Sequence, residues 1–137
     1  MGLRIARDDA RQRVILTVRG VVGAALFERG IRELRLDETR TYGALWDLRE
    51  VSLGEGRGDL TKIRSAVLAL DQRQPRPGPV ALVVDDASVT LANAYTLMTA
   101  PAGYKIRVFR SLEQADDWIT QMLAVGQNQT DAIDAGR

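Results

Sequence analysis

A strand that leaves through a glycine-rich loop into a helix lies in the middle of the chain and restricts the folds that it can adopt. The sequence from Tyr42 to Leu60 is YGALWDLREVSLGEGRGDL. Its first part, Tyr42 to Leu48, is an apolar run typical of a strand, and Asp59 opens a helical pattern after the loop. In α/β domains, the exit from a strand into a helix usually holds a ligand or a switch. The stretch therefore predicts an α/β fold with its functional surface at this loop.

The residues on either side predict four more strands and bring the predicted helices to four. Alternating or continuous apolar residues indicate strands over Leu3 to Arg7, Arg13 to Arg19, Val80 to Val84 and Lys105 to Phe109. Apolar residues at helical spacing indicate helices over about 24–34, 60–73, 88–98 and 111–125. The first two strands are joined by a short charged turn, so we expect an antiparallel hairpin. The prediction is an α/β fold: a mostly parallel five-stranded sheet with an antiparallel edge strand and four helices.

The end of the chain predicts a last helix and a tail. Ser111-Leu-Glu-Gln114 is a capping box that begins the helix, and Gly126 is placed to end it. Gln127 to Arg137 has almost no apolar content, so we expect it to fray. The length of 137 residues suits one hydrophobic core. We therefore predict one α/β domain over residues 1–125 and a flexible tail over 126–137.

The absence of two residue types excludes several mechanisms. The chain contains no cysteine and no histidine, which rules out disulfides, thiolate nucleophiles and every Ser-His-Asp or Cys-His mechanism. Carboxylates and Tyr104 are the remaining acid-base groups, and nothing pairs them at a defined spacing. We expect a protein that is not an enzyme, with no catalytic residues, no metal and no cofactor.

Charge and hydropathy restrict the partners. The net charge is +1, from 19 basic and 18 acidic residues, so no overall field attracts nucleic acid or anionic membranes. The start of the chain is charged from position 4 onward and lacks the apolar segment of a signal peptide. No apolar run approaches the ~20 residues that a membrane span needs. We expect a cytoplasmic protein without nucleic-acid binding or membrane insertion.

The order of the elements resembles the STAS domain family, and in particular the STAS-like proteins related to Sec14-type lipid-binding domains. The segments that carry the resemblance are VILTVRGVVGAALFERGIREL, LWDLREVSLGEGRGDLTKI, PVALVVDD and IRVFRSLEQADDWI, within about residues 3–124. The most specific of them is Arg107-Val108-Phe109, followed by a capped helix with Ala115 and Trp118. The resemblance implies a STAS-like fold and a binding or regulatory function.

The same resemblance allows a comparison with the phosphorylation switch of this fold. In anti-sigma-factor antagonists, a partner kinase phosphorylates a serine in an Asp-Ser-Ser-Gly loop at the start of the second helix. Here Glu55 stands in place of the aspartate, Gly56 and Arg57 stand where the serines would be, and Gly58 matches the glycine. Ser52 lies before the switch position and Thr61 after it. The resemblance therefore implies a regulatory module without the usual phosphorylatable serine.

The glycine-rich loop itself has two interpretations. A phosphate-binding loop is one, but no Gly-Lys-Ser/Thr follows, and Glu55 and Asp59 would place negative charge where a phosphate must lie. Asp59 is better explained as the N-cap of the following helix. The other interpretation, which we favour, is a surface for a protein partner or a second copy of the chain. Its residues are Gly54, Glu55, Gly56, Arg57, Gly58, Asp59 and Thr61.

Other groups of residues are weaker candidates. Asp47 lies in or just past one predicted strand, and Asp85 and Asp86 lie at the end of another. The three can be interpreted as a Mg²⁺ site, although a turn and a helix cap explain the last two as well. The third helix is predicted to be capped by Ser88. Lys105, Arg107 and Arg110 fit a charged strand edge, and Trp46 and Trp118 fit the core. The alternative function is binding of a small apolar or lipid-like ligand between the second and third helices.

Overall fold

The computed structural model describes most of the sheet and two helices of this chain. The described residues are 2–22, 24–34, 36–53, 65, 78–86, 88–89, 92–93 and 105–135. The strands are β1 (Gly2–Asp8), β2 (Arg13–Val22), β3 (Gly43–Leu53), β4 (Val80–Val83) and β5 (Ile106–Phe109), and the helices are α1 (Ala24–Glu33) and α4 (Leu112–Ala135). Two helices with defined bounds are thus present in this part of the chain, not four. The second and third predicted helices, over 60–73 and 88–98, lie almost entirely outside the described residues.

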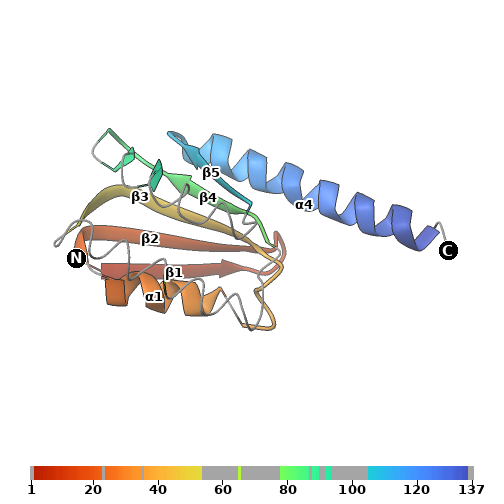
Figure 1. The fold of residues 1–137 in the computed structure, drawn as a ribbon, viewed down its shortest axis with the longest axis horizontal. Coiled ribbons are helices and arrows are strands. Elements are labelled where there is room, and N and C mark those ends of the chain that lie inside the picture. The colour runs from red at the N-terminus through yellow and green to blue at the C-terminus, as the bar shows by residue number, and fades with distance from the viewer. Residues whose placement is uncertain are drawn as a thin grey trace.

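The strands form one sheet in the order β1-β2-β3-β4-β5 (Figure 1). β1 runs antiparallel to β2, and every other pair of neighbours is parallel. The antiparallel pair is a hairpin closed by the short charged turn, whose residue Gln12 adopts a φ of 56°. This arrangement confirms the predicted mostly parallel five-stranded sheet with an antiparallel edge strand.

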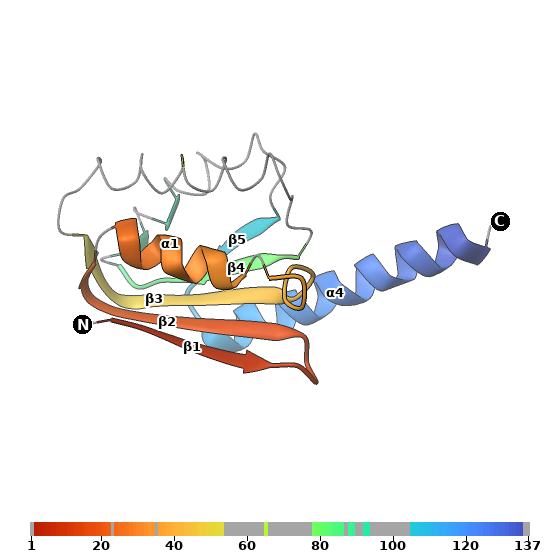
Figure 2. The same cartoon turned by 90° about the horizontal axis from the view of Figure 1, so that it is seen from below.

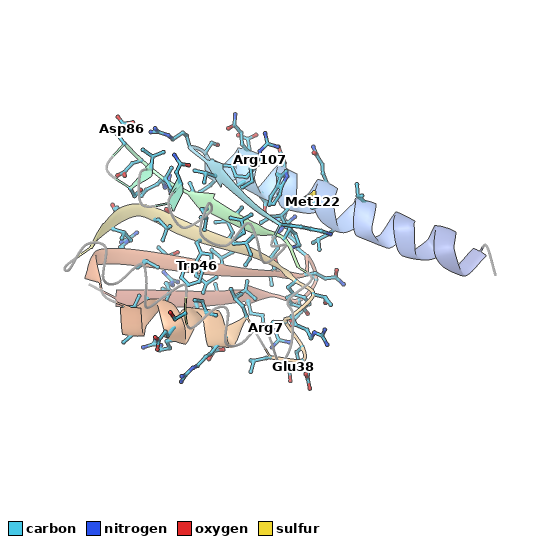
Figure 3. The ribbon with its side chains drawn as sticks, in the orientation of Figure 1. Arg7, Glu38, Trp46, Asp86, Arg107 and Met122 are labelled. Atoms are coloured by element: carbon cyan, nitrogen blue, oxygen red, sulfur yellow. The ribbon has the colours of Figure 1, made fainter. Side chains whose placement is uncertain are left out.

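One face of the sheet packs against α1. Leu16 of β2 and Trp46 of β3 lie in this core, together with Ile31 of α1. Trp46 is 5% exposed and lies near the middle of the sheet, so its predicted core position is confirmed (Figure 3). A Cβ atom at Gly30 of α1 would lie 2.5 Å from Cη2 of Trp46. The missing side chain therefore lets α1 approach the tryptophan closely.

The opposite face packs against α4, but only over part of the sheet (Figure 2). Ala115 and Ile119 of α4 are fully buried against Leu45 of β3 and the β4 residues Ala81 and Val83. Trp118 packs at the margin of this core against Phe109, with ring centroids 5.6 Å apart. On this side α4 also covers the start of β2, where Arg13 contacts Asp116 and Ile15 packs against the α4 core. Over β1 and the rest of β2, neither described helix covers this side of the sheet. We call the residues that β1 and β2 present there the open face: Arg4, Ala6, Ile15, Thr17 and Arg19.

Helix α4 is longer than its sequence predicts. Ser111 caps it as expected, since the Gln114 N–H donates to the Ser111 Oγ at 3.4 Å. The predicted end at Gly126 is wrong, because α4 continues to Ala135 and extends beyond the sheet (Figure 1). A glycine inside a helix costs only about 1 kcal/mol relative to alanine, and no proline follows it to stop the helix. The division into a domain over 1–125 and a tail over 126–137 stays a prediction. Neither described helix is long and apolar enough to cross a membrane.

Candidate functional site

The predicted partner surface lies outside the described residues. This holds for all of its members: Gly54, Glu55, Gly56, Arg57, Gly58, Asp59 and Thr61. The space between the second and third predicted helices, where an apolar ligand was the alternative, falls on the same undescribed stretches. The strand that leads to the loop is described as far as Leu53. The site is therefore built from the side chains at the carboxyl ends of β2, β3 and β4.

A β-bulge lies where β3 approaches the loop. Thr17 pairs with Asp47, but the next pair is Arg19 with Glu50, so β3 has one residue more than β2 in this interval. Bulges are rare between parallel strands and common beside functional sites, where they redirect side chains. Between Asp47 and Glu50, the side chains of β3 therefore no longer alternate strictly between the two faces of the sheet.

Because of the bulge, two apolar side chains of β3 face the same core and a charged one faces the other side of the sheet. Leu48 and Val51 are three residues apart, yet both are buried in the core beneath α1. Without the extra residue, the strict alternation of a strand would place them on opposite faces. Glu50 remains on the polar side, where its carboxylate lies 2.9 Å from the Nε of Arg19. The bulge therefore places an exposed ion pair at the end of β2 and β3.

Asp47 forms a second ion pair beside the first. Arg49 donates from Nε to Oδ1 at 2.9 Å and from Nη2 to Oδ2 at 2.8 Å, and its backbone N–H donates to Oδ1 at 3.2 Å. The Asp47 side chain is 16% exposed. The hydrogen bonds from the Arg49 side chain are the largest influence on Asp47 and lower the pKa of its carboxyl. Asp47 is therefore held as a carboxylate at neutral pH.

This ion pair predicts a pH dependence of stability. Because the pKa of Asp47 is lower in the fold than in the unfolded chain, the pair stabilises the fold above the ordinary aspartate pKa. The contribution is lost as the pH falls through the lower folded value. Arg49→Ala is expected to cost up to about 1 kcal/mol in urea unfolding at pH 7 and to lose less stability than wild type on acidification. Arg110→Ala, which removes the exposed pair with Asp86, is the control and should follow the wild-type acid profile.

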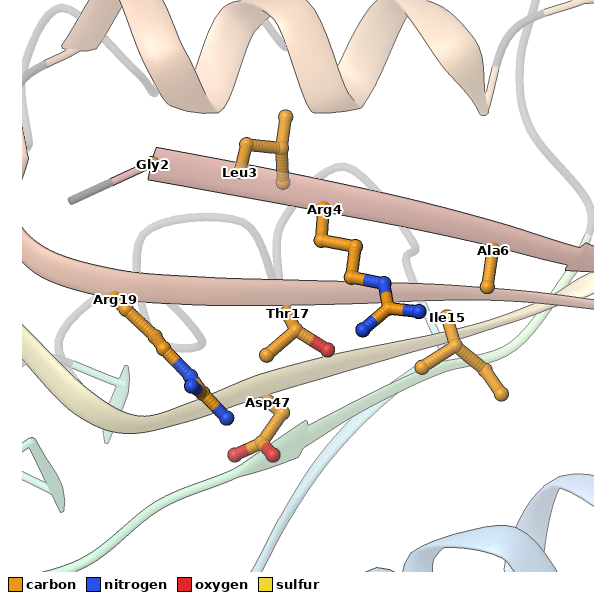
Figure 4. Close-up of a pocket in the computed structure, with 8 residues that line it drawn as sticks. All are labelled: Gly2, Leu3, Arg4, Ala6, Ile15, Thr17, Arg19 and Asp47. Atoms are coloured by element: carbon orange, nitrogen blue, oxygen red, sulfur yellow. The ribbon is translucent and has the colours of Figure 1, made fainter.

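The charged side chains line a groove at the strand ends. Its volume is about 470 Å³, and we call it the strand-end groove. Its polar lining consists of Thr17, Arg19, Asp47, Arg49, Glu50 and Asp85. It continues into a cavity of about 500 Å³ over the open face, and the two share Thr17, Arg19 and Asp47. The polar surface thus extends from the end of β3 to the edge strand β1 (Figure 4).

The two aspartates after β4 have different partners. The Ser88 N–H donates to Asp85 Oδ1 at 2.9 Å, and the Asp85 N–H donates to Ser88 Oγ at 3.1 Å. The helix begins at Val89, directly after Ser88, and the Ser88 carbonyl oxygen accepts a hydrogen bond from the Ala92 N–H, as expected of the N-cap position. The Asp85 carbonyl oxygen accepts from the Val89 N–H, so Asp85 and Ser88 together form the turn that starts this helix. Asp86 instead pairs with Arg110 at 2.5 Å. The interpretation of these aspartates as turn and cap is confirmed, and no group of three or more potential metal ligands occurs among the described residues.

The comparisons with known proteins identify a fold. No protein-family model and no curated protein matches the chain. Among solved structures, it is similar to an uncharacterised protein from Shewanella loihica PV-4, of the DUF3478 family, whose crystal structure has a SpoIIAA-like fold. The sequences are 17% identical, and the match covers 86% of this chain and 92% of that chain with a TM-score of 0.56. This likeness confirms the STAS-like fold that the order of elements implied.

Proposed function

We propose that this STAS-like domain is a non-enzymatic binding or regulatory module that recognises a protein partner at the carboxyl end of β3. The observation that carries the proposal is the strand-end groove, in which two arginine–carboxylate pairs, Arg19–Glu50 and Asp47–Arg49, reach solvent beside the strand that leads into the loop. Fixed charges at the rim of an interface give specificity and speed association. The sequence that follows Leu53 contains Arg57 and Asp59, and the proposal includes these two residues in the partner surface.

The same charges argue against catalysis. A general acid or base works best with a pKa near the working pH. The Arg49 hydrogen bonds lower the pKa of Asp47, which moves it away from neutrality. Asp85 belongs to the turn that starts a helix, and its Oδ1 accepts hydrogen bonds from the backbone N–H and Oγ of Ser88. The groove thus supports recognition by paired charges and hydrogen bonds.

The proposal is tested by removing the two charges of the loop. We expect Arg57→Ala/Asp59→Ala to fold as wild type does and to recover about tenfold less of the partner in quantitative affinity capture from its own cells. A matched control, Arg107→Ala/Asp117→Ala, removes one exposed arginine and one exposed aspartate that line the same groove beside β5. Arg107 is labelled in Figure 3. The control should recover the partner as wild type does. Equal recovery by both double variants contradicts the proposed surface.

A further inference from the structure

The open face is a polar surface with an apolar floor. In Figure 4, Arg4, Thr17 and Asp47 project from the same side of the sheet, whereas Leu3 projects from the other. The pairs Arg4 with Thr17 and Thr17 with Asp47 place these three in one row across β1, β2 and β3. Ala6 and Ile15 form the next pair and supply the floor of the cavity of about 500 Å³. The surface can therefore hold both charged and apolar side chains.

The charge of this surface is positive. Arg4 is exposed and has no carboxylate partner among the described residues. Arg19 lies on the same face, and its pair with Glu50 is exposed on both sides, 68% and 65%, so that solvent screens it. The negative charge of Asp47 is already neutralised by Arg49. Arg7, Arg11 and Arg13 have carboxylate partners elsewhere, so the positive charge of the open face comes from Arg4 and Arg19.

The edge of β1 offers backbone groups next to these charges. β1 spans seven residues, and in the part of the chain that the structure describes it pairs with β2 alone. An edge strand presents a row of N–H and C=O groups that an extended peptide can pair with. Gly2 lies opposite Arg19 and has no side chain. An acidic side chain on an added strand can therefore reach across Gly2 toward Arg19, since neighbouring strands lie only about 4.8 Å apart.

We propose that an acidic, extended segment of the partner protein adds to the sheet as a strand along β1. Its carboxylates meet Arg4 directly and Arg19 across Gly2, and its alternate side chains lie over Ala6 and Ile15. This inference rests on the proposed function, because it names the chemistry of the partner that the same polar surface receives. The backbone of β1 provides the hydrogen bonds, and the two arginines select acidic over basic segments.

The test uses a labelled octapeptide with glutamate at positions 1 and 3, valine at positions 5 and 7 and threonine at the even positions, so that one face of the added strand carries both carboxylates and apolar groups. The same peptide with lysine in place of glutamate is the comparison. Fluorescence anisotropy at low salt is expected to show binding of the acidic peptide only, and binding should weaken as salt screens the charges. Arg4→Glu should weaken this binding about tenfold, because an attraction becomes a repulsion. Arg29→Glu makes the same charge change at an exposed position of α1 and should leave the affinity unchanged. Amide NMR shifts should concentrate on β1.

Several outcomes overturn the inference. They are no binding of the acidic peptide, equal loss in the two variants, or NMR shifts centred away from β1. Competition by inorganic phosphate without shifts in the β1 backbone identifies a simple anion site, and concentration-dependent self-association through β1 identifies a second copy as the occupant; both contradict strand addition by a partner. If Arg57→Ala/Asp59→Ala loses the partner while the peptide fails to bind, the proposed function stands and this inference fails. If the acidic peptide binds along β1 while Arg57→Ala/Asp59→Ala still recovers the partner, the proposed loop surface fails and strand addition along β1 stands.

Discussion

Replacing Gly43 with alanine is expected to destabilise the fold by about 2 to 3 kcal/mol, as overpacking of a close contact does. The added Cβ would lie 2.2 Å from Cγ2 of Ile119, a fully buried residue of α4. Gly43 begins β3, so neither the strand nor the helix can move without disturbing the core between them. Urea unfolding followed by circular dichroism measures the loss.

A double-mutant cycle assigns the cause. Ile119→Ala removes the atom that clashes, at a cost of about 2 to 5 kcal/mol for the buried side chain. In that background, Gly43→Ala is expected to cost little, because its new methyl group enters the space that Ile119 has left. Equal costs of Gly43→Ala in both backgrounds would show that the effect arises from the strand alone and not from the approach of α4.

Replacing Asp116 with alanine is expected to cost about 2 to 3 kcal/mol, because it leaves a buried arginine without its counter-charge. The Arg13 side chain is 3% exposed, and its Nη1 lies 3.0 Å from Asp116 Oδ1. Arg13 also donates from Nη2 to the Asp116 carbonyl oxygen and to the Thr120 hydroxyl, and Arg11 reaches Asp116 Oδ2 at 2.6 Å. These contacts fasten α4 to the start of β2. Thermal or urea unfolding measures the change.

Two further variants test this explanation. Asp117→Ala changes the neighbouring, exposed position of the same helix and should alter the free energy of unfolding by less than about 0.5 kcal/mol. Arg13→Met/Asp116→Leu replaces the pair by apolar side chains of similar size and should recover much of the stability lost in Asp116→Ala. A double variant as unstable as Asp116→Ala would contradict the argument that the unpaired buried charge causes the loss.

The strands could be predicted because the apolar and polar pattern of each one reflects which of its faces is buried. Val80 to Val84 is apolar throughout and proves to be buried on both faces. β2 shows the limit of such reasoning. It continues beyond Arg19 to Val22, through Gly20 at a φ of 84°, because its neighbour β3 is long enough to pair with it up to Leu53. The end of a strand is thus decided partly by the strand beside it.

The contacts that hold α4 could not be predicted from local patterns. Arg13 is charged and begins a strand, so nothing near it in the sequence indicates burial, and its acceptor in α4 is 103 residues away. The close approach of Gly43 to Ile119 likewise depends on how α4 crosses the sheet. Both contacts join distant segments, which periodicity within one segment cannot reveal.

The sequence could predict only some of the residues of the candidate site. The sequence predicts that the strand ends close to Asp47, but β3 continues to Leu53, so Asp47 lies within the strand. Arg49, two residues later on a strand of period two, is a partner that the sequence could have indicated. The pairing of Arg19 with Glu50 depends on the bulge, and a bulge between parallel strands leaves no glycine here to mark it. The open face could not be predicted because it results from the path of α4, which covers the start of β2 and leaves β1 and the rest of β2 uncovered among the described residues.

The most direct test of the proposed function is native mass spectrometry of the untagged protein from its own cells, for the wild type and for Arg57→Ala/Asp59→Ala. If the domain is a protein-binding module, the wild type carries an added mass of the size of a second polypeptide, which denaturation releases and which the variant lacks. A small-molecule mass on both proteins, released on denaturation and without any polypeptide, would contradict the proposal and point to a ligand-binding domain instead.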